Sequence, residues 1–136
     1  MKTNINECLA KISVESARIV SKEMQVFYNT VMSLNRDISV LLLNSIDNKE
    51  MQIADPLAAS GVRSIRFLKE LSKNKIKKIF VNDHNKDAVS SIKENLSLNK
   101  INYKNNKKVG IFNEDANLFL LNSNGFDYID IDPFGS

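Results

Sequence analysis

The stretch that decides the fold is FDYIDIDPFGS, residues 126–136. Tyr128, Ile129 and Ile131 favour a strand, and Pro133 ends it because proline has no backbone donor for a sheet. The sequence therefore predicts a short buried strand with a carboxylate, a proline and an aromatic ring at its carboxyl end. In an open α/β sheet, ligands bind outside the carboxyl ends of the strands.

The corner formed by Asp132, Pro133 and Phe134 suits chemistry on the exocyclic amine of a flat base. The carboxylate accepts a hydrogen bond from the amine, the carbonyls near the proline are free, and the ring stacks on the base. The same residues also fit an ordinary turn, because Asp-Pro pairs commonly start turns. The sequence upstream decides between these two interpretations.

Upstream of this stretch, strand patterns alternate with helix patterns. We expect Ile65, Leu68 and Leu71 to share one helix face and Val89, Ile92 and Leu96 another. Alternation of this kind predicts parallel strands joined by right-handed crossovers, so the fold class is α/β and doubly wound. The expected strands are 51–55, 78–83 and 108–112, and the expected helices are 61–71, 86–98 and 115–121.

The first 48 residues are expected to form an amino-terminal extension, followed by an α/β core over 49–136. Residues 7–14 alternate enough to predict a short strand or hairpin. A helix is predicted over 31–46, with Asn29 or Thr30 as its N-cap. Its apolar residues recur at helical spacing and are Val31, Leu34, Ile38, Leu41, Leu42 and Ile46.

Composition narrows the class of protein. A chain of 136 residues with 43% hydrophobic residues can bury one core. Cys8 and His84 are the single cysteine and histidine, so neither a disulfide framework nor a Cys-rich zinc site is expected, and we predict no metal. No apolar run has the length of a membrane span and no secretory signal is visible, so we predict a cytoplasmic protein without a membrane partner.

The net charge of +3 is compatible with a nucleic-acid partner. The lysines concentrate in 69–78 and 100–108, where asparagines separate them. Solvated loops explain this pattern better than a binding patch does.

The turn after the first parallel strand, residues 55–63, has one glycine where a dinucleotide fingerprint has three. Small residues followed by Arg63 suit a compact ligand that bears a carboxylate, which arginine holds with two parallel hydrogen bonds. The alternative is that Arg63 is a surface helix residue, and this alternative is stronger for Arg66.

The next two strand ends carry further carboxylates. Asp83 stands where an acid reaches ribose hydroxyls. Asp115 fits either an ordinary helix N-cap or an acceptor for an adenine amino group, with Ala116 offering its backbone donor. Four successive strands that each end in a carboxylate favour an adenosine with a carboxylate-bearing tail and no pyrophosphate. S-adenosylmethionine has this structure, so the pattern predicts a Rossmann-like class I methyltransferase.

Six pieces of the sequence together form a specific combination. They are Phe27-Tyr28-Asn29, Leu34-Asn35-Arg36-Asp37-Ile38, residues 55–66, Asn82-Asp83, Glu114-Asp115-Ala116-Asn117 and Asp130-Ile131-Asp132-Pro133-Phe134-Gly135-Ser136. In these pieces, and so over nearly its whole length, the chain resembles the tRNA guanine-26 N2-methyl/dimethyltransferases. Two positions depart from that family, which usually has proline where this chain has Thr30 and lacks a proline at the place of Pro56. The approach to the first helix is therefore expected to differ.

The resemblance implies roles for single residues and a partner, tRNA. Asp132 would be the catalytic carboxylate, while Phe134 would stack on the flipped guanine and Phe27 would help to bind it. Without the resemblance, Arg36 and Asp37 fit a surface ion pair of little energetic value. Cofactor contacts would come from Arg36 and Arg63 at the methionine end, Asp83 at the ribose, and Asp115 with Ala116 at the adenine.

Members of that family continue beyond the equivalent of residue 136 with further strands and a carboxyl-terminal domain. We therefore expect a half-domain with sheet order 3-2-1-4, an unpaired fourth strand at its edge, and no tRNA methylation by these 136 residues alone. The missing carboxyl-terminal part of the same enzyme would be a partner. Two alternatives stay open, another exocyclic-amine methyltransferase acting on rRNA, DNA or a protein glutamine, and a non-catalytic nucleotide- or RNA-binding module.

Overall fold

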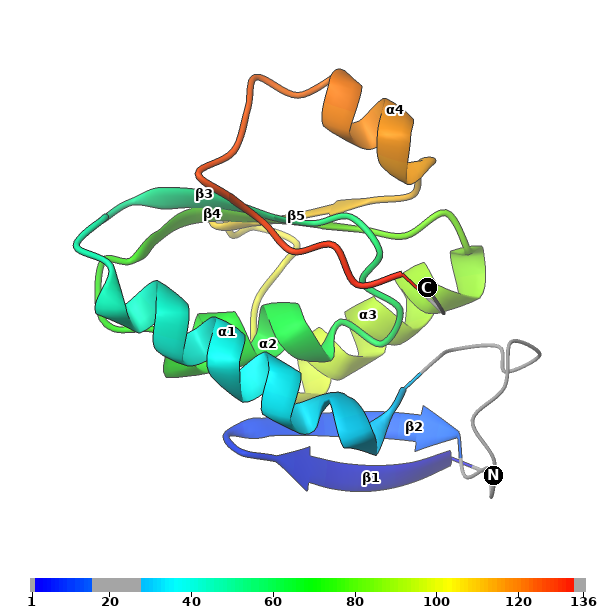
Figure 1. Ribbon diagram of the computed structural model, residues 1–136. Helices are drawn as coiled ribbons and strands as arrows, with labels where there is room; N and C mark the ends of the chain where they lie inside the picture. The colour runs from blue at the N-terminus through cyan, green and yellow to red at the C-terminus, as the bar shows by residue number, and fades with distance from the viewer. Residues whose placement is uncertain (1, 16–27, 134–136) are drawn as a thin grey trace.

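A computed structural model describes residues 2–15 and 28–133 (Figure 1). The predicted helices and the first three predicted parallel strands are present, with ends within two residues of those expected. The elements are β1 (Lys2–Glu7), β2 (Ala10–Glu15), a 3-10 turn η1 (Thr30–Met32), α1 (Ser33–Ser45), β3 (Met51–Asp55), α2 (Val62–Glu70), β4 (Ile76–Asn82), α3 (Lys86–Leu98), β5 (Val109–Phe112), α4 (Ala116–Leu121) and β6 (Tyr128–Ile129).

Four parallel strands form the central sheet in the order β5-β4-β3-β6. In chain order of the parallel strands this is 3-2-1-4, so the predicted topology is confirmed. Ile53 of the central strand β3 pairs with Ile79 on one side and Tyr128 on the other. Helices α1, α2 and α3 cover one face and α4 lies on the other (Figure 1).

The amino-terminal extension is an antiparallel hairpin of β1 and β2, which confirms the hairpin alternative for residues 7–14. It lies on the far side of the helical layer from the sheet (Figure 1). The backbone N–H of Ser13 donates to Asn95 Oδ1 at 2.7 Å, and that of Lys11 donates to Asn99 Oδ1 at 2.8 Å. Ala10 and Ile12 are fully buried, so the hairpin is part of the core.

The last strand differs from the prediction of a buried strand. β6 has two residues, and within the described chain it pairs with β3 alone. Ile129 is 41% exposed and Ile131 is 63% exposed, because no described element covers them. The prediction of an edge strand is correct for the part of the chain that the structure describes, and the prediction of its burial is wrong.

Helix α1 also buries a different face from the one expected. Asn29 caps the preceding η1 turn by accepting from the N–H of Val31, as predicted. The apolar residues Leu34, Ile38, Leu41 and Leu42 are all about half-exposed or more. The buried side is a mixed one, because polar side chains there have partners on α2 and on the hairpin; it consists of Arg36, Ser39, Val40 and Leu43. No helix in the described residues is long and apolar enough to cross a membrane.

Candidate functional site

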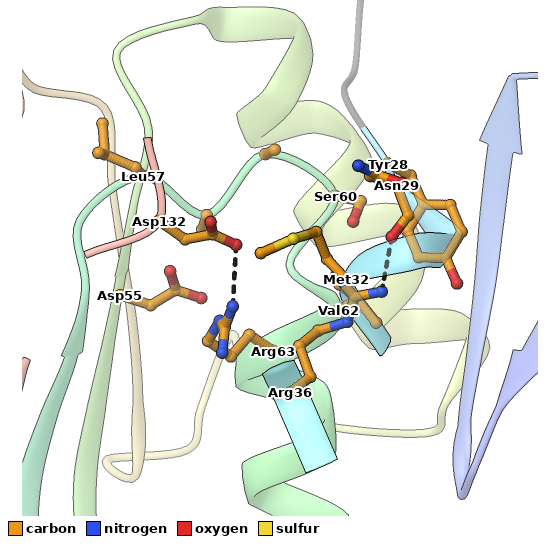
Figure 2. A pocket seen from close by; sticks show the side chains of 12 residues that line it. Tyr28, Asn29, Met32, Arg36, Asp55, Leu57, Ser60, Val62, Arg63 and Asp132 are labelled. Carbon is orange, nitrogen blue, oxygen red and sulfur yellow. Dashed lines mark hydrogen bonds and ion pairs between the residues drawn. The ribbon is translucent and has the colours of Figure 1, made fainter. Parts of the chain in front are cut away.

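A cavity opens at the carboxyl ends of β3 and β6 (Figure 2). The η1 turn and α1 form one wall, and the β3–α2 loop with the start of α2 forms another. Its lining residues are Tyr28, Asn29, Met32, Arg36, Asp55, Leu57, Ala58, Ala59, Ser60, Val62, Arg63 and Asp132.

The β3–α2 loop lines this cavity with Leu57 and with the small residues Ala58, Ala59 and Ser60. The chain turns tightly here, since the N–H of Gly61 donates to the carbonyl of Ala58 at 2.7 Å. Gly61 caps α2 in the left-handed region at φ +74°, and a Cβ there would lie 3.2 Å from Ile92 Cγ1. A residue with a side chain would be strained at this position and crowded against α3. The loop thus brings the first turn of α2 to the edge of the cavity.

Arg63 is a buried residue of this site, so its interpretation as a surface helix residue is wrong. Its Nη1 donates to Ser39 Oγ at 2.9 Å and its Nη2 to Asn35 Oδ1 at 2.9 Å. Its Nη2 also donates to Asp132 Oδ2 at 2.8 Å, and its Nε pairs with Asp130 Oδ1 at 3.1 Å. Arg63 therefore ties α1, α2 and the end of β6 together.

Two carboxylates pair with this arginine, and a third, that of Asp55, is influenced by its charge. Asp55 is 2% exposed and accepts a hydrogen bond from Ser64 Oγ at 2.7 Å. Burial raises the pKa of Asp55 to about 7, and the negative charge of Asp130 adds to this rise, while Ser64 and Arg63 oppose it. Asp132 is more accessible, with 35% of its side chain exposed. Within the described residues its second oxygen, Oδ1, has no hydrogen bond, so this oxygen is open to a ligand.

Arg36 lines the cavity, and its guanidinium is bound by Glu7 of β1, which is not itself a lining residue. Its Nε donates to Glu7 Oε1 at 2.7 Å, and its Nη2 donates to Glu7 Oε2 at 2.6 Å and to the Asn29 carbonyl at 2.9 Å. Tyr28 donates to Glu7 Oε2 at 2.7 Å, and its ring lies 5.2 Å from Arg36 Cζ. The interpretation of Arg36 as a surface ion-pair residue is wrong, since it is 4% exposed.

Arg66 is also buried, at 2% exposure, and does not line the cavity. It forms ion pairs with Glu7, Asp37 and Glu70. Its interpretation as a surface residue is therefore wrong. Of the two arginines considered for a ligand carboxylate on α2, Arg63 is the one at the cavity.

Asp83 and Asp115 stand at the ends of the neighbouring strands. Asp83 Oδ2 accepts from the N–H of Ala59, a cavity residue, at 2.9 Å, and its Oδ1 accepts from the N–H of Asn85 at 3.0 Å. Asp115 is the N-cap of α4. Its capping role is therefore confirmed, and it is made through Oδ1 alone, so the cap does not decide whether Asp115 also binds a ligand; Ala116 is the first residue of that helix.

A residue that sequence reasoning missed joins these strand ends. Asn82 is fully buried, and its Nδ2 donates to the carbonyls of Pro56 and Glu114 at 3.0 and 2.9 Å. Its Oδ1 accepts from the N–H of Glu114 at 3.0 Å. These bonds hold the loops after β3, β4 and β5 on one rim of the sheet. An asparagine directly before the strand-end Asp83 was the signal in the sequence.

Glu7 was missed as well, and its sequence position gave no signal, because it lies in the hairpin far from the strand ends. Phe27 and Phe134, the residues expected to contact the base, lie outside the described residues. Groups of three or more His, Cys, Asp or Glu residues that could hold a metal ion are not found in 2–15 or 28–133.

Comparison with known proteins gives a consistent result. A family model described as N2,N2-dimethylguanosine tRNA methyltransferase matches residues 9–136. A tRNA (guanine(26)-N(2))-dimethyltransferase of Methanococcus maripaludis is 43% identical over 97% of this chain and 35% of its own length. A tRNA (guanine(26)-N(2)/guanine(27)-N(2))-dimethyltransferase of Aquifex aeolicus is 43% identical over 97% of this chain and 34% of its own length.

Among solved structures, the complex of Trm1 from Pyrococcus horikoshii with S-adenosyl-L-methionine is similar to this chain with a TM-score of 0.81. The two are 35% identical, and the match covers 98% of this chain and 36% of that one. The chain spans about a third of the length of the curated relatives it matches.

Proposed function

Because this chain belongs to the N2,N2-dimethylguanosine tRNA methyltransferase family, we propose that it provides the S-adenosylmethionine site and the catalytic carboxylate for methylation of the exocyclic N2 of guanine-26 in tRNA. One observation supports this most directly. Asp132 and the buried Arg63 meet at the edge of a cavity formed by the ends of β3 and β6. In this proposal, the part that corresponds to the remaining two thirds of the relatives' length is also a part of the enzyme to which this chain belongs.

The residues at the cavity suit S-adenosylmethionine, which supplies an activated methyl group on sulfur. Arg63 and Arg36 provide positive charge at the cavity wall for the carboxylate of the methionine end. The left-handed turn at Gly61 keeps the loop backbone close to a ligand. We assign the ribose to Asp83, which is anchored to that loop through Ala59, and the adenine to Asp115 and Ala116 at the start of α4.

Asp132 would act on the amine through its open oxygen. Arg63 holds Oδ2, so the carboxylate is fixed in direction while Oδ1 accepts a hydrogen from guanine N2. That hydrogen bond would make the nitrogen lone pair available. As the bond from N2 to the methyl carbon forms, the carbon–sulfur bond would break and leave a neutral thioether, while the N2 proton would pass to Oδ1 of Asp132. The remaining task is alignment of N2 with the methyl group, which a rigidly held carboxylate supports. Phe134 and Phe27 are proposed to hold the base after it leaves its stack.

The test compares two matched carboxylates of the same segment. We expect Asp132→Asn to lower methyl transfer to a tRNA transcript at least about 100-fold. The control, Asp127→Asn, should retain transfer, because Asp127 is exposed and lies at the amino end of β6, opposite to the cavity rim. It accepts a hydrogen bond from the N–H of Gln52, and asparagine can also accept this bond. Transfer is measured in a chimera in which this chain replaces the matching third of the Methanococcus maripaludis relative.

Binding is measured separately on the chain itself by calorimetric titration with S-adenosylmethionine, NAD and ATP. We expect heat of binding with S-adenosylmethionine alone of the three ligands.

In the transfer experiment, methylation of a transcript with adenine at position 26 would contradict the assignment of the reaction. Equal losses of transfer in the Asp132 and Asp127 variants would contradict the assignment of Asp132.

A further inference from the structure

Glu7 is a buried carboxylate of the hairpin that lies between arginines from two helices. It is 6% exposed, although it is the last residue of an edge strand. Its Oε1 accepts from Arg36 Nε and from Arg66 Nη1 at 3.1 Å, and its Oε2 accepts from Arg36 Nη2 and Tyr28 Oη. Each carboxylate oxygen of Glu7 therefore accepts two hydrogen bonds.

These bonds extend to the cavity through Arg36. Figure 2 shows the Arg36 side chain reaching from α1 towards Asn29 and Tyr28, all three of which line the cavity. Glu7 engages Nε and Nη2 of the guanidinium as a fork, which fixes the plane of the group. Nη1 is the nitrogen outside that fork. The direction in which Arg36 presents its charge to the cavity thus depends on a residue of the hairpin.

We propose that Glu7 is a positioning residue. It holds Arg36 in one orientation at the cavity wall, and Arg36 in that orientation binds the carboxylate of the ligand. The hairpin then forms part of the binding site for the amino-acid end of S-adenosylmethionine without touching it. This inference rests on the proposed function, because it concerns the same ligand.

The variant Glu7→Gln tests this because glutamine has the same shape but cannot accept four bonds. In either orientation of the amide, its NH2 group faces two donors, so Arg36 must move. We expect affinity for S-adenosylmethionine to fall about tenfold, as for the loss of a charged hydrogen bond. Affinity for 5′-methylthioadenosine, which has the adenosine and sulfur but no carboxylate, should stay within about twofold.

The matched control is Glu70→Gln. Glu70 pairs with Arg66 in the same cluster and loses the same charge, yet it has no bond to Arg36. We expect it to leave the ratio of the two affinities unchanged. If Glu7→Gln does not fold, as judged by thermal unfolding, Glu7→Asp replaces it, because the shorter side chain keeps the charge but does not reach Nε and Nη2 of Arg36 together. A selective loss of about threefold for S-adenosylmethionine is then expected.

Both affinities are measured calorimetrically on the 136-residue chain. A selective loss for S-adenosylmethionine supports the proposal. An equal loss of affinity for both ligands, which leaves the ratio of the two affinities unchanged, assigns Glu7 a purely structural role. A selective gain for S-adenosylmethionine means that Glu7 competes with the ligand for Arg36. Either result overturns the proposal. If the wild type binds neither ligand, the proposed function fails with it, whereas unchanged selectivity in the variant overturns this inference alone.

Discussion

The molecule contains two buried ionic clusters that differ in charge balance. In the hairpin cluster, two arginines pair with three carboxylates from the hairpin and the two helices. In the rim cluster, one arginine pairs with two carboxylates and lies near a third. The hairpin cluster consists of Glu7, Arg36, Asp37, Arg66 and Glu70, and the rim cluster consists of Asp55, Arg63, Asp130 and Asp132.

The pKa shifts of the two clusters run in opposite directions. Burial of Glu7 would raise its pKa, yet hydrogen bonds from Arg36 and Tyr28 and the charge of Arg36 lower it overall. Asp55 is buried beside further carboxylates, and its pKa rises to about 7. The ionised form of Glu7 is therefore favoured by its donors, while the ionised form of Asp55 is disfavoured by its burial. Perturbation of this kind is characteristic of functional sites.

The largest effect is expected from Arg63→Met, which removes the single arginine of the rim cluster. Asp130 and Asp132 would then lose their ion-pair partner and Asp55 a nearby positive charge, and we expect the free energy of unfolding at pH 7 to fall by about 3–5 kcal/mol. Arg66→Met also removes a cation that pairs with three carboxylates, but it should cost less. Glu7 keeps both of its bonds to Arg36, and the other two carboxylates, Asp37 and Glu70, are partly exposed to water. The measurement is urea denaturation of both variants at pH 7 and pH 4.

The difference between these two variants should shrink at pH 4, where carboxyl groups bind protons and no longer need a cation. If Arg66→Met proved the more destabilising of the two at pH 7, the distinction between the clusters would be wrong.

A smaller effect, with a definite sign, is expected from Asp55→Asn. The pKa of Asp55 is about 7 in the folded chain and 3.8 in the reference state. Between these values the unfolded chain is ionised and the folded chain keeps the proton, so the wild type loses stability as pH rises from about 4 to 7. Asparagine mimics the neutral acid and still accepts from Ser64, so the variant does not incur this loss.

We therefore expect Asp55→Asn to gain stability relative to the wild type as pH rises, by about 1.4 kcal/mol for each unit of pKa shift and a few kcal/mol in total. Unfolding curves of both proteins at pH 4, 5.5, 7 and 8 give this difference, in which the other titrating groups cancel. A constant difference across that range would show that Asp55 is ionised throughout.

The rim cluster could largely be predicted from the sequence, and the hairpin cluster could not. Strand ends are recognisable from local patterns, and parallel topology brings them to one rim, so Asp55 and Asp132 were identified as neighbours. The partner of Arg36 is Glu7, 29 residues away in a hairpin whose docking follows from tertiary contacts. No local pattern encodes such a pair.

Helix α1 illustrates the same limit of local patterns. Apolar periodicity identified the helix correctly, but three of the residues that make up the periodic pattern, Leu34, Ile38 and Leu41, are exposed. The side chains that are in fact buried, Arg36 and Ser39, are polar and have partners on the hairpin and on α2. Periodicity reports which face is apolar, whereas burial depends on what the rest of the fold packs against it.

The smallest effect is expected from Asp37→Asn, at the solvent edge of the hairpin cluster. Its carboxylate pairs with Arg66 Nη2 at 2.7 Å, but its side chain is 41% exposed, and Arg66 keeps Glu7 and Glu70. Water screens such a pair, so the loss in the free energy of unfolding should be below about 1 kcal/mol and should decrease further in 1 M salt. Denaturation at low and high salt measures both quantities. A loss as large as that of Arg63→Met would mean that the hairpin cluster also depends on each of its charges. The two clusters would then not differ, although the hairpin cluster offers its arginines alternative partners and the rim cluster has a single cation.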